Sequence, residues 1–262
     1  MADLLSGADP APVEIVNPTS NHPLLLTGDH AGNAVPVAFG DLSLPAGEID
    51  RHIGWDIGVA GLARALARKL EATAVLARYT RLLIDPNRPL GEADSIPARS
   101  DGTPIKANQN LSEEQRAVRA DALYWPYHRA IDMQIGRIQR LGHVPVLLAL
   151  HSFTPALNLG ARPRPWHVGV LYGSDARFAD RLLDAFRARD GLVVGDNEPY
   201  SGMTHGYGLK VHGIAHGIPH AELEIRQDLI GSKEGQERWA DVLAEVLVPL
   251  LGETALRQIE HH

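Results

Sequence analysis

The chain has 262 residues, 44% of them hydrophobic, and a formal net charge of −7. This composition excludes a wholly disordered chain, and the length suits one large or two small domains. The absence of cysteine excludes disulfides, thiolate metal sites and cysteine nucleophiles, and the negative charge disfavours non-specific binding to nucleic acid. Because 13 histidines are present, any transition-metal site has to be built from histidine and carboxylate side chains.

Residues 1–20 are rich in Pro, Ala and Asp, and we expect them to form a loosely held N-terminal arm. They contain no basic start followed by a long apolar segment, so no signal peptide is expected. No run in the chain approaches the roughly 18 apolar residues of a membrane span. We therefore expect a cytoplasmic protein without a membrane partner.

Two apolar segments each lead to a histidine. The first, residues 24–27, is followed by a glycine-flanked turn that contains His30, and the second, residues 144–150, is followed directly by His151. Continuous apolar runs of this length predict strands that are buried on both faces. Ligands of open α/β sheets bind beyond the carboxyl ends of such strands, where a histidine can hold a metal or move a proton. Alternatively, His151 caps the strand and bonds a nearby backbone carbonyl.

A helix is predicted over residues 57–70, where the apolar side chains at 59, 62, 66 and 70 fall on one stripe. Asp56 directly precedes this helix, and an N-cap role would by itself explain an aspartate there. Strands are predicted over residues 73–77 and 81–84. The second is closed by Asp85-Pro86-Asn87-Arg88, which opens a long loop of about residues 89–110, and loops of this length are often functional.

The remaining elements alternate between helix and strand. Ser112 and Gln115 form a capping-box pattern that opens a helical region to about residue 141, with a kink or a break expected at Pro126. Further elements are predicted at 167–171, 176–189, 192–194, 209–216, 219–225 and 233–250. This alternation predicts one α/β domain over residues 1–262.

The predicted strand ends carry the parts of a mononuclear zinc hydrolase. Such a site needs two histidines and a carboxylate as ligands, with a fourth position left open. It also needs a separate carboxylate for proton transfer and, for an acidic substrate, an arginine. The polar groups at these ends are His30, Asp85 with Asn87 and Arg88, His151, and Glu224 with Arg226. The chain has no HExxH motif, and without a G-x-S-x-G motif a serine mechanism is disfavoured.

Together, several segments resemble the N-formylglutamate amidohydrolase family, in its subgroup of predicted members. They are LLLTGDHAGNAVP (24–36), GWDIG (54–58), LLIDPNRP (82–89), LLALHSFTP (147–155) and LKVHGIAHGIPHAELEIRQDLI (209–230). This family is similar in fold to the zinc carboxypeptidases, in which D-x-N-R and I-H-S-Y/F segments occur in the same order. The resemblance implies a mixed central β-sheet of about eight strands, flanked by helices.

The resemblance also implies roles for individual residues. His30 and His151 match the metal histidines, Glu224 matches the catalytic glutamate, and Asn87 and Arg88 match residues that contact the substrate and the oxyanion. The chain departs from the H-x-x-E pattern of the carboxypeptidases, since Asn33 stands where the glutamate ligand would be. We expect Asp56 to supply the missing carboxylate ligand, with Asp29 and Glu48 as weaker candidates.

Three further assignments complete the expected site. Glu222 and Glu224 share one face of a strand, so either could be the base, and the family pattern favours Glu224. Arg226 lies on that face too, where it either binds a substrate carboxylate or holds Glu224. His212 is expected to contact the substrate.

These expectations define a zinc-dependent amidohydrolase with one Zn²⁺ per chain, although such a ligand set also accepts other divalent metals. The expected substrate is a small N-acyl amino acid of the N-formyl-L-glutamate type, a reaction that belongs to histidine degradation. Metal-activated water would attack the amide with Glu224 as base. The alternatives are a carboxypeptidase or peptidoglycan-type amidase, and a non-catalytic binding protein that has lost the metal.

Overall fold

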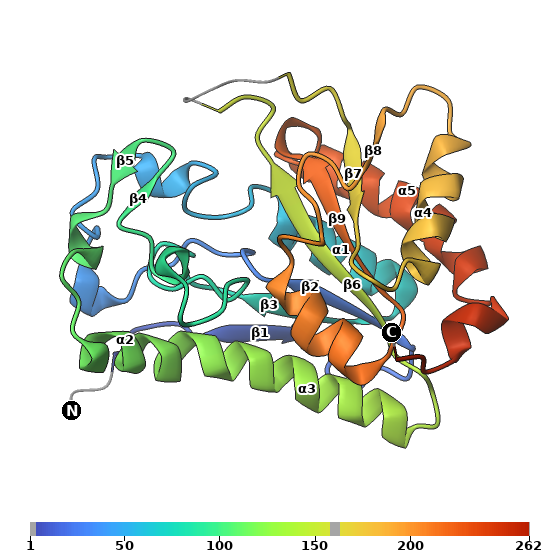
Figure 1. Ribbon diagram of the computed structural model, residues 1–262, viewed down its shortest axis with the longest axis horizontal. Coiled ribbons are helices and arrows are strands. Elements are labelled where there is room, and N and C mark those ends of the chain that lie inside the picture. The colour runs from blue at the N-terminus through green and yellow to red at the C-terminus, as the bar shows by residue number, and fades with distance from the viewer. Residues whose placement is uncertain (1–3, 158–162, 262) are drawn as a thin grey trace.

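The computed structural model describes residues 4–157 and 163–261, so the first three residues of the expected arm lie outside it. A seven-stranded mixed sheet forms the centre, in the order β1-β3-β2-β6-β9-β7-β8 (Figure 1). Strands β2, β3, β6 and β9 run parallel to one another, β1 and β7 are antiparallel to their inner neighbours, and β8 is parallel to β7. The strands are β1 (Val13–Val16), β2 (Leu24–Gly28), β3 (Thr73–Ala77), β6 (Val146–Phe153), β7 (Val168–Leu171), β8 (Val194–Asp196) and β9 (His220–Arg226).

Helices cover both faces of the sheet, which confirms the predicted α/β architecture. Helices α1 (Val59–Leu70), α4 (Arg177–Arg187) and α5 (Lys233–Leu250) pack on one face, and α3 (Trp125–Arg140) packs on the other (Figure 1). Successive side chains of a strand point to opposite faces, so Leu24 and Leu26 join the first layer while Leu25 joins α3. Burial on both faces is the reason that these strands read as continuous apolar runs.

A smaller lobe beside the sheet holds the hairpin of β4 (Arg99–Ser100) and β5 (Thr103–Pro104), followed by α2 (Glu113–Arg119). The buried guanidinium of Arg119 organises this lobe. It donates to the Leu83 and Ala107 carbonyls, each at 3.0 Å, and to Asn108 Oδ1 at 2.7 Å. The long loop after residue 89 is therefore folded into a second apolar cluster with its own buried core.

Local signals set the boundaries of the helical region as predicted. Ser112 and Gln115 form the capping box at the start of α2. A π-helical turn, Ala120–Tyr124, separates α2 from α3, and Pro126 stands in the first turn of α3. The expected short helix after residue 208 is a π-helical turn, Leu209–Gly213, followed by a 3₁₀ turn, Ile214–His216. No helix within the described ranges is both long enough and apolar enough to cross a membrane.

Two local expectations differ from the structure. Residues 81–84 form a turn rather than a strand, because Leu82, Leu83 and Ile84 pack into the apolar cluster of the small lobe instead of pairing with the sheet. The N-terminal segment is not a loose arm throughout, because Val13–Val16 pairs with β3 as the edge strand β1. Within the described residues the central sheet has seven strands, against about eight expected.

Candidate active site

The parallel strands β2, β6 and β9 are neighbours, and their carboxyl ends bring the expected residues to one edge of the sheet. His30 lies in the turn after β2, and His151 lies near the end of β6. Glu224 of β9 is the register partner of His151, and Glu222 precedes it on the same face. These four residues line one cavity with a volume of about 400 Å³.

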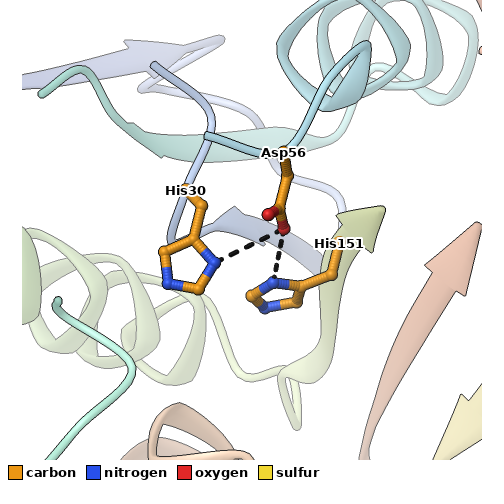
Figure 2. Close-up of side chains that lie close together, drawn as sticks. All are labelled: His30, Asp56 and His151. Carbon is orange, nitrogen blue, oxygen red and sulfur yellow. Dashed lines mark hydrogen bonds and ion pairs between the residues drawn. The ribbon is translucent and has the colours of Figure 1, made fainter. Parts of the chain in front are cut away.

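Asp56 does not cap the following helix. The N-cap of α1 is Gly58, and no side chain caps that helix end. The carboxylate of Asp56 instead points toward the two histidines (Figure 2): its Oδ2 lies 2.8 Å from His151 Nδ1 and 3.4 Å from His30 Nδ1. All three side chains are buried. The structure thus brings together two imidazoles and one carboxylate that could hold a metal ion.

Carboxylates also lie on the far side of each imidazole. His30 Nε2 is hydrogen-bonded to Asp85 Oδ1 at 2.7 Å, whereas His151 Nε2 lies 3.2 Å from Asp29 Oδ2 without hydrogen-bond geometry. A carboxylate hydrogen-bonded in this position fixes the orientation and tautomer of a metal-binding histidine, as Asp85 does for His30. For His30, Arg81 Nη1 lies 3.2 Å from Nδ1, and because a guanidinium only donates, Nδ1 presents its lone pair.

A proton or a metal ion has to lie between His151 Nδ1 and Asp56, and Arg81 Nη1 adds a positive charge 3.9 Å from Asp56 Oδ1. An unprotonated Nδ1 and a carboxylate oxygen in contact repel each other unless a proton or a metal ion lies between them. Burial lowers the pKa of His151, but Glu222, Asp29 and Asp56 outweigh burial and raise that pKa well above its ordinary value. Metal binding to such a group releases the proton. The donor set therefore fits a divalent metal held by two imidazoles and a carboxylate.

Two buried glutamates adjoin this cluster. Burial raises the pKa of Glu224 well above its ordinary value, and burial raises that of Glu222 as well. Glu222 Oε2 lies 3.8 Å from His151 Nε2, whereas Glu224 Oε2 has no hydrogen-bond partner within the described part of the chain. A buried carboxyl of this kind has the chemistry of a general base or acid near neutral pH.

Asn87 and Arg88, the predicted substrate contacts, lie on the cavity wall. The Asn87 side-chain oxygen accepts a hydrogen bond of 2.9 Å from the Gly208 amide. Arg88 Nε donates at 2.7 Å to Asp94, whose side chain is 60% exposed. An arginine paired with a solvated carboxylate can exchange that partner for a substrate carboxylate at little cost, because exposed ion pairs contribute little to stability.

The structure does not bring His212 or Arg226 to the cavity wall. Strand β9 ends at Arg226. The guanidinium of this residue pairs with Asp228 at 2.8 Å and does not line the cavity that Glu224 lines. His212 is buried on the other side of the Asp85–Arg88 loop, against α3. The roles expected for these two residues in substrate contact are therefore corrected. Glu48, a weaker candidate for metal ligation, bonds Arg51 and Thr103 instead.

Arg81 has a role that no sequence pattern indicates. It lies in the turn after β3 rather than in the predicted strand, it contacts His30, and its Nη2 donates to Asp85 Oδ2 at 2.5 Å. Asp29, a weaker candidate ligand, lies instead beside Nε2 of His151, on the side away from Asp56. Neither role has a periodic or spacing signal, since both depend on contacts between separate strand ends.

Comparisons with known proteins identify the family and the fold. The model of the N-formylglutamate amidohydrolase family matches residues 22–231. The crystal structure of the gene product Atu2144 from Agrobacterium tumefaciens is similar with a TM-score of 0.89 and 33% identity, covering 95% of this chain and 98% of that one. N-formylglutamate amidohydrolase from Ralstonia eutropha JMP134 shares the fold with a TM-score of 0.66 at 23% identity, over 92% of this chain and 97% of that one. No curated protein matches the chain. The chain belongs to the N-formylglutamate amidohydrolase family.

Proposed function

We propose that this protein is a metal-dependent amidohydrolase that cleaves the amide of a small N-acyl amino acid of the N-formyl-L-glutamate type. One observation carries the proposal: Asp56 Oδ2 contacts Nδ1 of both His30 and His151, beside a buried Glu224. The cavity of about 400 Å³ is in the size range of small-molecule sites.

The metal would be held by His30, Asp56 and His151, one ion per chain. Zn²⁺ suits two imidazoles and a carboxylate, and other divalent metals fit the same donors. When bound, such an ion lowers the pKa of a water molecule and polarises a carbonyl. Asp85 holds the His30 imidazole through a hydrogen bond, Asp29 lies beside Nε2 of His151, and each Nδ1 faces Asp56.

The chain's own residues supply proton transfer and binding. Glu224 accepts a proton from the attacking water and returns it to the leaving nitrogen as the C–N bond breaks. The water oxygen remains with the released acid, which is formate for a formyl substrate, and the amine leaves as the free amino acid. Arg88 binds the substrate carboxylate through paired N–H donors, and Asn87 contacts the same end of the substrate.

The variant Glu224→Gln tests this proposal, because glutamine keeps the shape of the side chain but cannot accept the proton. We expect it to bind one equivalent of metal and to release formate from N-formyl-L-glutamate about 10²–10⁴-fold more slowly than the wild type. Glu222→Gln is the matched control on the same strand face, and we expect a smaller loss from it.

Other outcomes would redirect the assignment. Full turnover by Glu224→Gln, or turnover that survives chelation, would overturn the proposed mechanism. Release of C-terminal residues from peptides, with no formate from N-formyl-L-glutamate, would indicate a carboxypeptidase. Wild-type protein that neither retains metal nor hydrolyses any N-acyl amino acid would indicate a binding protein.

A further inference from the structure

Two buried histidines contact each other outside the cavity wall. His128 lies on α3, and His212 lies in the π-helical turn Leu209–Gly213. Their side chains belong to residues that are 6% and 3% exposed, and His128 Nδ1 lies 2.7 Å from His212 Nε2. The proposed reaction uses neither of them. Buried polar groups in folded proteins are almost always hydrogen-bonded, so each ring nitrogen of the pair should have a partner.

The outer nitrogens of the pair contact groups that only accept hydrogen bonds. His128 Nε2 lies 3.0 Å from the Pro86 carbonyl, and His212 Nδ1 lies 2.8 Å from Asp132 Oδ1. Both outer nitrogens must therefore carry a proton, and the contact between the rings needs another. Two neutral imidazoles carry one proton each, which leaves one hydrogen bond unmade. The pair therefore holds one extra proton and one positive charge.

The surroundings place this charge on His212. The carboxylate of Asp132 contacts His212 directly and lies on the same helix as His128. Burial and the adjacent His212 lower the pKa of His128 to about 4, so His128 is the neutral partner. The other titratable groups that face the pair are Asp29 after β2, His216 beyond the π-helical turn, and the phenols of Tyr124, Tyr127 and Tyr207.

The Pro86 residue connects the histidine pair to the candidate active site. Pro86, whose carbonyl accepts from His128, stands between Asp85 and Asn87. Asp85 in turn accepts from His30 at 2.7 Å. On the other side of the loop, Asn87 accepts from the amide of Gly208, the residue directly before the π-helical turn that carries His212. The loop is thus tied to this turn both through the histidine pair and through Asn87.

We propose that His128 and His212 are positioning residues that share one extra proton and hold the Asp85–Arg88 loop in the geometry that orients His30. The effect of this pair on catalysis rests on the proposed function. The shared proton itself follows from the hydrogen bonds alone. The carbonyl of Pro86 keeps its donor only while His128 keeps the tautomer with a protonated Nε2. Protonated His212 enforces that tautomer, because it donates to His128 Nδ1.

The variant Asp132→Asn tests the proposal in the full-length protein, because asparagine keeps an acceptor oxygen but removes the charge that favours the extra proton. Asp132 is 52% exposed, so this variant is not expected to unfold. Heteronuclear NMR of the imidazole nitrogens should show His212 protonated on both nitrogens in the wild type at neutral pH. In Asp132→Asn, that second proton should be lost at the same pH.

Kinetics and metal binding provide the second readout. We expect Asp132→Asn to lower kcat and metal affinity by up to about 10-fold with little change in KM, and to restrict full activity to lower pH. His216→Gln is the matched control, since His216 also lies near Asp132, at 3.7 Å, but is half exposed and outside the pair. It should leave the NMR signature and kcat unchanged.

Distinct results separate this inference from the proposed function. Neutral His128 and His212 in the wild type, or equal behaviour of Asp132→Asn and the wild type in NMR and kcat, would overturn the inference. Wild-type protein that releases no formate would overturn the proposed function instead. The NMR signature and the metal affinity of Asp132→Asn would still decide whether the histidine pair holds the loop.

Discussion

Asp56 Oδ2 lies 2.8 Å from Nδ1 of His151, a residue 95 positions later in the chain. The same oxygen also contacts His30, which lies 26 positions earlier. Arg81 Nη1 lies 3.9 Å from Asp56 Oδ1 and supplies part of the charge that balances this buried carboxylate. Two imidazoles and one carboxylate that meet at one point are also the donors that a divalent metal takes, and this arrangement can be tested by single substitutions.

Asp56→Asn separates the metal-ligand role from the helix-cap role that local sequence suggests. Asparagine caps helices as well as aspartate does, so a cap would tolerate the change. If Asp56 is a metal ligand, the variant should weaken metal binding by about two orders of magnitude or more. Loss of an outer hydrogen-bond partner of a ligand typically costs less, about 10–100-fold. Competition with a chelator measures this affinity. Glu48→Gln, which alters a carboxylate outside the cluster, should bind metal like the wild type.

Asp85→Asn should weaken metal binding without removing a ligand. Its carboxylate accepts from His30 Nε2 and also from Arg81 and the Asn87 amide, so the variant loosens the His30 ring and removes the charge nearest to Arg81, whose contact with Asp56 remains. We expect the dissociation constant of the metal to rise by about 10–100-fold. Asp94→Asn changes only the exposed partner of Arg88. If both variants had the same metal affinity, Asp85 would have no role in orienting His30.

Arg88→Met and Arg226→Met distinguish the two arginines that the sequence offered as substrate contacts. Hydrogen bonds to a charged group contribute about 1.5–3 kcal/mol, so the loss of Arg88 should raise KM by about 10–100-fold for a carboxylate-bearing substrate. Arg226 pairs with Asp228 away from the cavity, and its variant should keep the KM of the wild type. Steady-state kinetics on N-formyl-L-glutamate measures both. An unchanged KM in Arg88→Met would place the carboxylate site elsewhere.

The histidine pair predicts a pH dependence of stability. Burial lowers the pKa of His128 from 6.5 to about 4, whereas the unfolded chain titrates near its ordinary value of about 6.5. Between these values the unfolded state binds more protons, so the free energy of unfolding falls as the pH drops through this range. The loss from this group is at most about 3 kcal/mol and is complete below about pH 4. Above about pH 6.5 His128 is neutral in both the folded and the unfolded state, so it adds no further pH dependence to the free energy of unfolding.

Urea unfolding of chelated protein at a series of pH values measures this slope. His128→Gln removes the titrating group, and its stability should therefore fall less steeply than that of the wild type between about pH 6.5 and pH 4. Parallel curves for the two proteins would mean that His128 titrates alike in the folded and unfolded states.

Local signals predicted most of the elements, for physical reasons that the structure makes plain. The apolar runs became β2 and β6, because strands covered by helices on both faces have no polar side. The capping box of Ser112 and Gln115 marked the start of α2, since its hydrogen bonds join residues within one turn. The strand predicted over residues 81–84 was wrong because its apolar residues pack into the small lobe, and no local pattern in the neighbouring sequence indicates that lobe.

The sequence by itself determined that buried strands end on histidine and carboxylate side chains, because burial and capping depend on neighbours in the chain. Only the tertiary structure decided which of those side chains meet. It set β6 between β2 and β9, so that His151 contacts Asp56 and lies in register beside Glu224 of β9. It also turned Arg226 outward at the end of β9 and brought His212 against His128. Such contacts depend on strand order and register, which no local pattern encodes.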